Sequence, residues 1–328
     1  MPRPWTNLAL LGCGVITRTH SRTLRSLRLG IRCFYASREA ARAETLARRF
    51  GGAGSFGSYA AALVDDRIDT VLVATPPGSH LELTLAALQH GKNVIVEKPA
   101  FLRAADCALV RTAEARSGRQ VLVAENYCYK PLASALRRII GSGALGEIRF
   151  VELNAAKYQS TGGWRGDINE TGWGALFEGG VHWVDLLANL GLRIEAVHGF
   201  RPGDWRAQER SMLIVAEYEE GAVGTLTHSW EIPSPLRGLR FSHIYGTRGS
   251  VTFESNGLFA VVSGTSPRLL IPGIRDISGY RGMFRDFISA LQVGSQPVMS
   301  LARAQRGLEL IEAAYRNVST HPELETVP

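Results

Sequence analysis

Short apolar runs alternate with helix-like segments over the first 125 residues, and this alternation constrains the fold more than any other feature. None of the runs shows the apolar–polar alternation of a strand with one face in water. Each is therefore expected to be a strand buried on both faces. The five runs occupy residues 8–11, 31–35, 70–74, 93–96 and 121–124.

Helical segments rich in Ala, Leu, Glu and Arg separate these strands at residues 38–50, 80–89 and 104–117, and a glycine follows each of them. Glycine is the residue that most often ends a helix. Parallel strands need a crossover connection, so alternating strands and helices form βαβ units. The sequence predicts an α/β fold in which residues 1–125 form a Rossmann domain, a doubly wound parallel sheet that binds a dinucleotide.

The pattern changes after about residue 145 to strands with one polar face, joined by tight turns. Such strands pair mostly antiparallel, so residues 126–328 are expected to form an α+β domain around a large, mostly antiparallel sheet. Two amphipathic helices, at 280–292 and 301–318, are expected to pack back against the domains. The expected strands occupy residues 148–158, 212–218, 223–230, 241–245 and 250–254.

Composition narrows the class of protein. The 328 residues carry a formal net charge of +7, yet only four of the 37 basic residues are lysines, and the arginines are scattered along the chain. Without a basic tail or an aromatic–basic motif, this charge does not favour nucleic acid as a partner. No apolar run reaches the roughly 18 residues of a membrane span. Four cysteines without C-x-x-C spacing indicate reduced thiols and a cytoplasmic location. No metal is expected to take part in the chemistry.

A glycine turn follows the first predicted strand. Gly12 permits a tight turn, and Gly14 lets the backbone approach a pyrophosphate. Val15 and Ile16 then open a helix, whose N–H groups and dipole favour an anion. Thr17 stands where the fingerprint has its third glycine or alanine. The turn after the first strand of a βαβ series predicts nucleotide binding.

The end of the second predicted strand bears on the choice of nucleotide. A carboxylate there would bind the ribose of NAD(H), whereas this sequence has Ser37 and Arg38, with Arg42 one turn along the next helix. A hydroxyl and guanidinium groups suit a 2′-phosphate. We therefore expect NADP(H) in preference to NAD(H). The alternative is that Ser37 only caps its helix and Arg38 faces solvent.

Glu97-Lys98-Pro99 follows the fourth of the five runs, and ligands bind at the carboxyl edge of a doubly wound sheet. The Lys98 ammonium can hydrogen-bond a substrate hydroxyl and stabilise developing alkoxide charge, with Glu97 orienting it. Both residues are also expected to lie beside the cofactor. The alternative for Lys98 alone is an ordinary surface lysine.

Four motifs in order resemble the Gfo/Idh/MocA oxidoreductase family over nearly the whole chain. They are Gly12-x-Gly14, the segment 75–80, Glu97-Lys98-Pro99 and the segment 172–182, with Glu125-Asn126-Tyr127-x-Tyr129-Lys130-Pro131 and Trp164-Arg165-Gly166-Asp167 between the last two. The resemblance implies pyridine-nucleotide chemistry on a sugar, polyol or nucleotide sugar. It also implies a substrate-binding and oligomerisation role for residues 126–328, in a homodimer or homotetramer.

The resemblance assigns Lys98 as the catalytic lysine and His182 as the catalytic histidine. Glu178 stands where the family most often has Asp, four residues before the histidine, and it is a candidate for binding substrate hydroxyls. We expect His182 to be the acid/base and Lys98 to polarise the oxygen, although the two can exchange roles.

Further site candidates follow from the resemblance. Thr75, Pro76 and His80 correspond to a loop beside the cofactor, although His80 is also placed to begin its helix. Stacking aromatics and hydrogen-bonding side chains are candidates for the wall that faces the sugar. These are Tyr127, Tyr129, Trp164, Arg165 and Asp167, and their alternative is core aromatics with a surface ion pair.

Two other functions fit the same fold. One is an oxidoreductase that retains its nucleotide and passes hydride between two substrates in turn. The other is a non-catalytic, nucleotide-sensing regulator. Retention of both Lys98 and His182 argues against a regulator, because a sensor needs no acid/base pair.

Overall fold

The computed structural model describes residues 6–160, 173–204, 207–233, 238–265 and 267–318. The chain forms two compact units. The first comprises Met1–Glu125 and Tyr280–Gln305, and the second comprises Asn126–Gly279 and Arg306–Pro328. The chain thus leaves the first unit after its parallel strands and returns to it for one helical segment.

A six-stranded parallel sheet forms the centre of the first unit, in the order β3-β2-β1-β4-β5-β6. The strand order reverses at β1, which makes the gap between β1 and β4 the topological switch point where ligands bind. The strands are β1 (Thr6–Leu11), β2 (Ile31–Ala36), β3 (Gly54–Phe56), β4 (Thr70–Val73), β5 (Asn93–Glu97) and β6 (Val121–Ala124).

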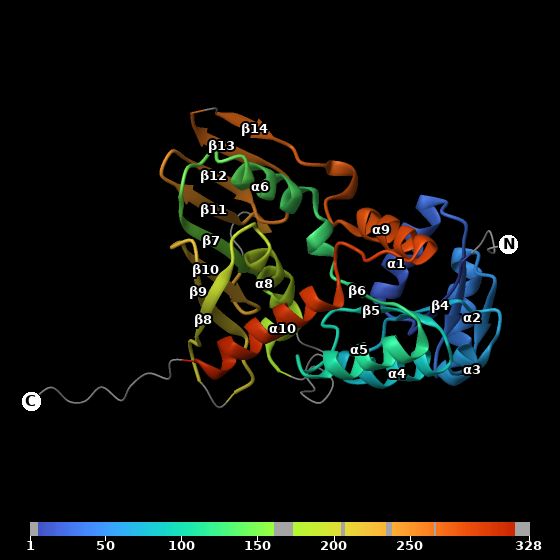
Figure 1. The fold of residues 1–328 in the computed structure, drawn as a ribbon. Coiled ribbons are helices and arrows are strands. Elements are labelled where there is room, and N and C mark those ends of the chain that lie inside the picture. Colours follow the sequence, from blue (N-terminus) through green and yellow to red (C-terminus); the bar gives the residue numbers. More distant parts are fainter. Residues whose placement is uncertain (1–5, 161–172, 205–206, 234–237, 266, 319–328) are drawn as a thin grey trace, which may run out of the picture. The chain divides into compact units, whose positions relative to one another are not determined.

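Helices cover both faces of this sheet, because right-handed crossovers on either side of β1 place their helices on opposite faces. Figure 1 shows α1 beside α9 and α4 beside α5. The helices are α1 (Val15–Leu27), α2 (Ala40–Phe50), α3 (Tyr59–Val64), α4 (His80–Gln89), α5 (Asp106–Ser117) and α9 (Tyr280–Val293), with a 3-10 turn, η1 (Pro77–Ser79), before α4.

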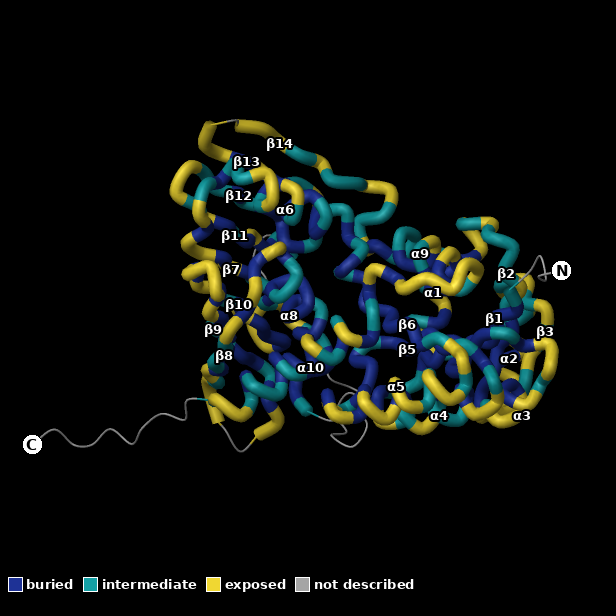
Figure 2. The backbone as a smooth tube through the Cα atoms, viewed as in Figure 1, coloured by how far each residue is buried: buried dark blue, intermediate teal, exposed yellow. Residues whose placement is uncertain are grey.

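Burial explains four of the five apolar runs. For the run at residues 31–35 the expectation of burial on both faces was wrong over its first half: in β2, Ile31 and Cys33 are half-buried and Arg32 is exposed, and the edge strand β3 pairs only with Phe34–Ala36. Every residue of β4 and β6 is buried, and β1 and β5 each have one half-buried residue, at the strand's first position. These strands are dark in Figure 2, whereas the helices around them show exposed stretches. With two faces covered, a strand has no position for a polar side chain in water.

The second unit contains an eight-stranded sheet in the order β14-β13-β12-β11-β7-β10-β9-β8. Its neighbours pair antiparallel except β7 and β10, which are parallel. The strands are β7 (Ile148–Ala156), β8 (Ile194–Phe200), β9 (Ser211–Tyr218), β10 (Val223–Ser229), β11 (Phe241–Gly246), β12 (Gly249–Glu254), β13 (Ala260–Gly264) and β14 (Arg268–Leu270). The predicted α/β fold, with one parallel and one mostly antiparallel sheet, is confirmed.

Helices pack on one face of this second sheet, and α8 contacts β7 and β10. On the strands, buried and exposed positions alternate, because only that face is covered. The helical segments are η2 (Asn126–Tyr129), α6 (Pro131–Gly141), the π-helical turn η4 (Leu176–Gly180), α8 (Val181–Ala188), the 3-10 turn η6 (Ile274–Asp276) and α10 (Leu301–Arg316), whose first residues belong to the first unit.

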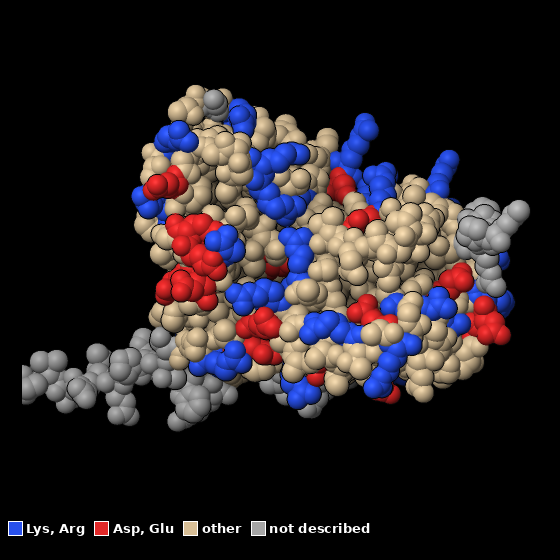
Figure 3. All heavy atoms as spheres, in the orientation of Figure 1, with Lys and Arg blue, Asp and Glu red and all other residues tan. Residues whose placement is uncertain are grey.

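The surface carries both signs of charge. On the face in Figure 3, lysine and arginine side chains are interspersed with aspartate and glutamate. Within the described residues, no helix has the length and apolar character to cross a bilayer.

Candidate functional site

The glycine turn between β1 and α1 lies against the end of β4. Gly12 has φ +107°, and a Cβ there would lie 2.5 Å from the carbonyl oxygen of Ala74. Thr17 is buried, and its hydroxyl donates to the Gly12 carbonyl oxygen at 2.8 Å. The threonine that replaces the third small residue of the fingerprint therefore holds the turn in place.

Gly14 leaves room beside the first turn of α1. A Cβ at Gly14 would meet no described atom within 4 Å, and the next residue, Val15, is 77% exposed. Gly14 is also the N-cap of α1, and because it has no side chain to cap the helix, the first N–H groups remain available to a ligand. This arrangement fits a pyrophosphate, which helix N-termini bind through N–H groups and the dipole.

The end of β2 places Ser37 inside and Arg38 outside. Ser37 is buried, and its hydroxyl accepts the Glu39 N–H at 3.1 Å. Ser37 therefore closes a short turn; the N-cap of α2 is Glu39 itself. Arg42 pairs with the Glu39 carboxylate at 2.9 Å, and both side chains are more than 60% exposed, so the pair is weak. Sequence reasoning missed Glu39.

The pKa of Cys13, in the glycine turn, responds to the cations near it. Burial raises the pKa of the Cys13 thiol, while a hydrogen bond to Ser37 and the charges of Arg42 and Arg18 oppose the increase. Arg18, on the exposed side of α1, was not predicted from the sequence. It adds a second guanidinium beside the glycine turn.

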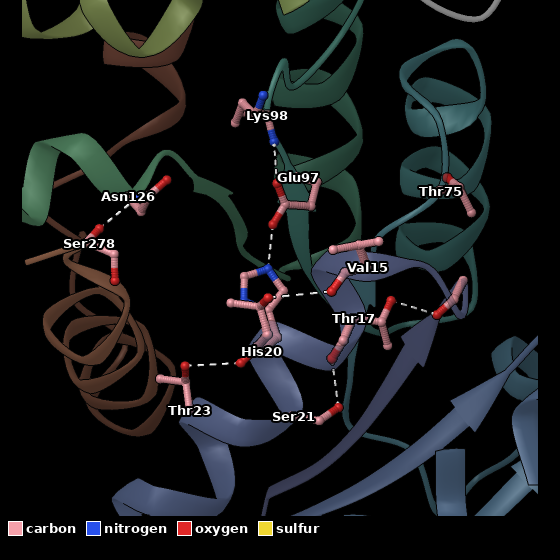
Figure 4. A network of polar contacts seen from close by, with 12 residues as sticks. Val15, Thr17, His20, Ser21, Thr23, Thr75, Glu97, Lys98, Asn126 and Ser278 are labelled. Atoms are coloured by element: carbon pink, nitrogen blue, oxygen red, sulfur yellow. Dashed lines mark hydrogen bonds and ion pairs between the residues drawn. The ribbon is translucent and has the colours of Figure 1, made fainter. Parts of the chain in front are cut away.

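Glu97 connects the Lys98 segment to α1 through a buried histidine that sequence reasoning also missed. Figure 4 shows Glu97 between the His20 ring and the Lys98 backbone. His20 Nε2 contacts Glu97 Oε1, and Glu97 Oε2 accepts the Lys98 N–H at 3.1 Å. Tyr280 and Phe284 of α9 pack edge-on against the His20 ring, with centroids 5.3 and 5.1 Å away.

Glu97 thus orients Lys98 through the backbone, and the Lys98–Pro99 bond that follows is cis. Burial raises the pKa of the Glu97 carboxyl, but the hydrogen bond from His20 and the charges of His20, Lys98 and His80 outweigh it, so this pKa lies below its usual value. The carboxylate remains charged, which keeps it an acceptor.

His80 joins the same segment to the loop after β4. It is fully buried at the start of α4, with Nδ1 2.9 Å from the Pro99 carbonyl oxygen and Nε2 2.9 Å from the Thr75 carbonyl oxygen. Burial lowers its pKa despite these two carbonyls. Both ring nitrogens are engaged by the protein, so His80 holds the two loops together. Thr75 and Pro76 remain half-buried at the carboxyl edge of β4.

In the second unit, Glu178 and His182 lie where a π-helical turn meets a helix. Glu178 is buried within η4, and His182 is the second residue of α8 and half-buried. Turns of this kind often mark functional positions. Both side chains act electrostatically on the buried His228 of β10.

Tyr127 of η2 stacks on the catalytic histidine candidate. Its ring lies 4.4 Å from the His182 ring at 13°, and it meets the neighbouring Trp183 edge-on at 5.3 Å. The buried Lys130 places its Nζ 4.1 Å from the centroid of the same tyrosine ring. Tyr129 is half-buried in the same turn. The structure therefore places Tyr127 beside His182.

Three other wall candidates, Trp164, Arg165 and Asp167, lie outside the described residues. Sequence reasoning missed three buried residues in this unit, His228, Trp230 and Arg240. Among the described side chains there is no group of three His, Cys, Asp or Glu residues with the geometry to hold a metal.

A glycine turn at the switch point of a 3-2-1-4-5-6 parallel sheet is the dinucleotide-binding arrangement. Comparison with protein families agrees. Residues 6–125 match the oxidoreductase family with an NAD-binding Rossmann fold, and residues 133–252 match the GFO/IDH/MocA C-terminal domain. The chain belongs to the GFO/IDH/MocA family and is an NAD(P)-dependent oxidoreductase.

Two relatives and one solved structure illustrate the similarity. D-xylose 1-dehydrogenase (NADP(+)) 2 of Haloferax volcanii is 26% identical, over 88% of this chain and 90% of its own. Levoglucosan dehydrogenase of Pseudarthrobacter phenanthrenivorans is 25% identical, over 76% of this chain and 73% of its own length. The WlbA dehydrogenase of Bordetella pertussis, solved with NADH and UDP-GlcNAcA, has TM-score 0.83 and 20% identity over 97% of this chain and 96% of its own. That structure shows a shared fold.

Proposed function

We propose that this oxidoreductase transfers hydride between NADP(H) and a carbinol or carbonyl carbon of a sugar, polyol or nucleotide sugar. The observation that carries the proposal is the Lys98 segment. It lies at the carboxyl edge of β5 in the sheet that holds the glycine turn, and it is braced by Glu97 and His80. Sugar dehydrogenases among the relatives support the substrate class.

In this proposal, residues 1–125 bind the nucleotide and residues 126–328 bind the substrate. NADP⁺, when bound, supplies the hydride acceptor at nicotinamide C4. His182 takes the hydroxyl proton as hydride leaves, and the Lys98 ammonium donates a hydrogen bond to the same oxygen. In reduction His182 returns the proton. Tyr127 and Glu178 orient the sugar, and the two catalytic residues can exchange roles without changing the balance of the reaction.

Preference for NADP(H) rests on the end of β2. Ser37, Arg38 and Arg42 supply a hydroxyl and two guanidinium groups, and Arg18 adds a third cation near Cys13. A 2′-phosphate would displace Arg42 from its exposed pair with Glu39, at little cost. The relatives include both an NADP(+) enzyme and a fold relative solved with NADH, so the arginines carry this part of the proposal.

Titration with NADPH and NADH, followed by turnover on a panel of sugars, polyols and nucleotide sugars, tests the proposal. NADPH is expected to bind about tenfold or more tightly than NADH, since a charge-assisted contact to phosphate is worth that much. Arg38→Ala should remove most of this difference. Gly14→Ala is the matched control: its Cβ enters the space beside α1, so affinity for both nucleotides should fall equally.

Equal or tighter binding of NADH would contradict the NADP(H) assignment. Tight nucleotide binding with no turnover on any member of the panel would favour the nucleotide-sensing alternative. Nucleotide that copurifies with the protein and is reduced and reoxidised without exchange would favour an enzyme passing hydride between two substrates.

We further propose a homodimer or homotetramer. On neighbouring strands of the second sheet, Phe150 is 54% exposed, Tyr245 38% and Val223 37%, and register places both opposite Phe150. An apolar group of this kind on an open sheet face favours association. Light scattering at micromolar concentration is expected to give the mass of two or four chains. The mass of one chain would contradict this.

A further inference from the structure

Arg240 is a buried cation without a direct counter-ion. The residue is 7% exposed, and its Nη2 donates to Asn256 Oδ1 at 2.6 Å, while its Nε has no hydrogen-bond partner in the described structure. Burial of an ionised group is costly unless the group is paired and fully hydrogen-bonded. An arginine that is neither therefore requires an explanation.

The nearby carboxylate of Glu254 does not supply one. Glu254 acts on Arg240 only electrostatically. Its own oxygens accept hydrogen bonds from Asn256 Nδ2 at 2.8 Å and from the N–H groups of Gly257 and Leu258 at 3.1 and 3.2 Å. The carboxylate is occupied by the β12–β13 turn, so the Arg240 Nε remains without a partner.

Arg240 stands at the same end of the sheet as two other buried groups with unpartnered nitrogens. It directly precedes β11, which runs antiparallel to β7, whereas β10 runs parallel to β7. The start of β11 and the end of β10 therefore meet at the carboxyl end of β7, roughly 10 Å apart across one intervening strand. His228 and Trp230, at the end of β10, have no partner for Nδ1 and Nε1 among the described groups.

The turn that carries Glu178 and the helix that carries His182 cover this corner. A Cβ on Gly179 would lie 2.9 Å from the Trp230 ring, and one on Gly180 would lie 3.4 Å from His228 Cγ. Arg240 Cζ lies 5.5 Å from the ring centroid of Trp183, the residue after His182. The guanidinium, which has no ion-pair partner among the described residues, therefore packs against the same short helix that carries the catalytic histidine candidate.

The electrostatics of His228 agree with a cationic corner. Burial, together with the charges of Lys157, Arg240 and His182, lowers the pKa of His228 to about 3, and only the charge of Glu178 opposes them. Two permanent cations, Lys157 and Arg240, and the titratable His182 thus act on one buried position, with one carboxylate.

We propose that Arg240 binds an anionic group of the substrate, so that this enzyme prefers a sugar carrying a carboxylate or a phosphate to its neutral counterpart. The inference rests on the proposed function and narrows its substrate class. The anion would accept a hydrogen bond from Arg240 Nε, while Trp183 packs against the guanidinium. The unpartnered nitrogens of His228 and Trp230 could bond further oxygens of the same group.

Turnover of matched substrates tests this with the full chain and NADP⁺. D-glucose is compared with D-glucuronate, glucose 6-phosphate and UDP-glucose, which separate a carboxylate, a phosphate monoester and a diphosphate. At least one anionic member is expected to have a kcat/KM about 10- to 100-fold above that of glucose. Arg240→Gln keeps a donor for Asn256 and removes the charge, so it should abolish this preference, mainly through KM.

Arg149→Gln is the control, since Arg149 is a half-exposed arginine of β7 paired with Glu147. It should leave the preference unchanged. Arg240→Lys, which retains a charge, should keep part of the preference and serves if the Gln variant does not fold. Equal kcat/KM for glucose and every anionic member, or a preference that survives Arg240→Gln, would overturn the inference.

Binding gives a second readout that does not depend on turnover. Glucuronate and inorganic phosphate, added to the protein with NADPH, are expected to change the intrinsic tryptophan fluorescence, to which Trp183 and Trp230 contribute, with saturation in the wild type but not in Arg240→Gln. Saturation without turnover on any sugar would support the anion site and refute the proposed oxidoreductase substrate class. No saturation by either anion in the wild type would overturn the anion site.

Discussion

His182→Asn is expected to lower kcat by about 10²- to 10⁴-fold, which is the usual contribution of a positioned general acid or base. Asparagine retains a hydrogen-bonding group beside Tyr127 but cannot exchange a proton near neutral pH. Steady-state kinetics on the best substrate of the panel gives kcat and KM, and NADPH titration should show unchanged affinity. His243→Asn, a half-buried histidine of β11 that contacts Thr252, is the control and should retain full activity.

The pH dependence of kcat/KM separates the two catalytic candidates. If His182 transfers the proton, the limb that reports it disappears in His182→Asn and persists, at a lower rate, in Lys98→Met. The opposite pattern would exchange the two roles. Full activity in either variant would remove that residue from the mechanism.

Much of the first unit was predictable because its strands are buried on both faces. A run such as 70–74, short and without a polar position, favours a strand in the centre of a covered sheet, and the structure has β4 there. β3 was missed because its three residues, Gly54–Phe56, lie at the sheet edge and are too few to show a period. Three strands of the second sheet were also missed: β8 and β14, which are its two edge strands, and β13, which lies between β14 and β12.

The site was only partly predictable, because its support comes from residues far apart in sequence. Lys98 and Glu97 were found from their place after a strand. His20 was not, although it contacts Glu97, because 77 residues separate the two and nothing in the α1 sequence marks which of its polar residues turns inward. The role of Thr17 likewise needed the fold, since only the turn brings its hydroxyl to Gly12.

Arg240 shows the limit more sharply. One arginine among 33 carries no sequence signal, and only its burial, its unpartnered Nε and its contact with Trp183 set it apart. Because lysine is rare in this sequence and arginine is common, the position of a lysine such as Lys98 suggested a function, whereas the position of a single arginine did not. The structure singles out Arg240 because it is buried and has no direct counter-ion among the described residues.

His228→Leu is expected to make the protein less sensitive to acid. Burial lowers the pKa of His228 to about 3 in the folded protein, against about 6.5 for an unfolded histidine. Between these values the unfolded chain binds a proton that the folded chain does not, so the free energy of unfolding falls as pH decreases, by on the order of 1 kcal/mol per pH unit. Leucine has a similar volume and does not titrate, so this contribution vanishes.

Equilibrium urea unfolding at pH 7, 6, 5 and 4 measures the effect as a difference between the two proteins. At pH 7 the free energy of unfolding of His228→Leu differs from that of the wild type by an amount set by how the leucine packs beside Gly180. Below about pH 6.5 this difference should move in favour of the variant by on the order of 1 kcal/mol per unit. Other groups such as Glu97 titrate in both proteins and cancel.

His90→Gln, at an exposed histidine after α4, is the control, and its free energy of unfolding should run parallel to that of the wild type at every pH. A His228→Leu curve that also runs parallel would show that His228 takes up its proton in the folded state. The corner beside His182 would then admit water, and Arg240 would not be held in the dry environment that makes an unpaired guanidinium costly.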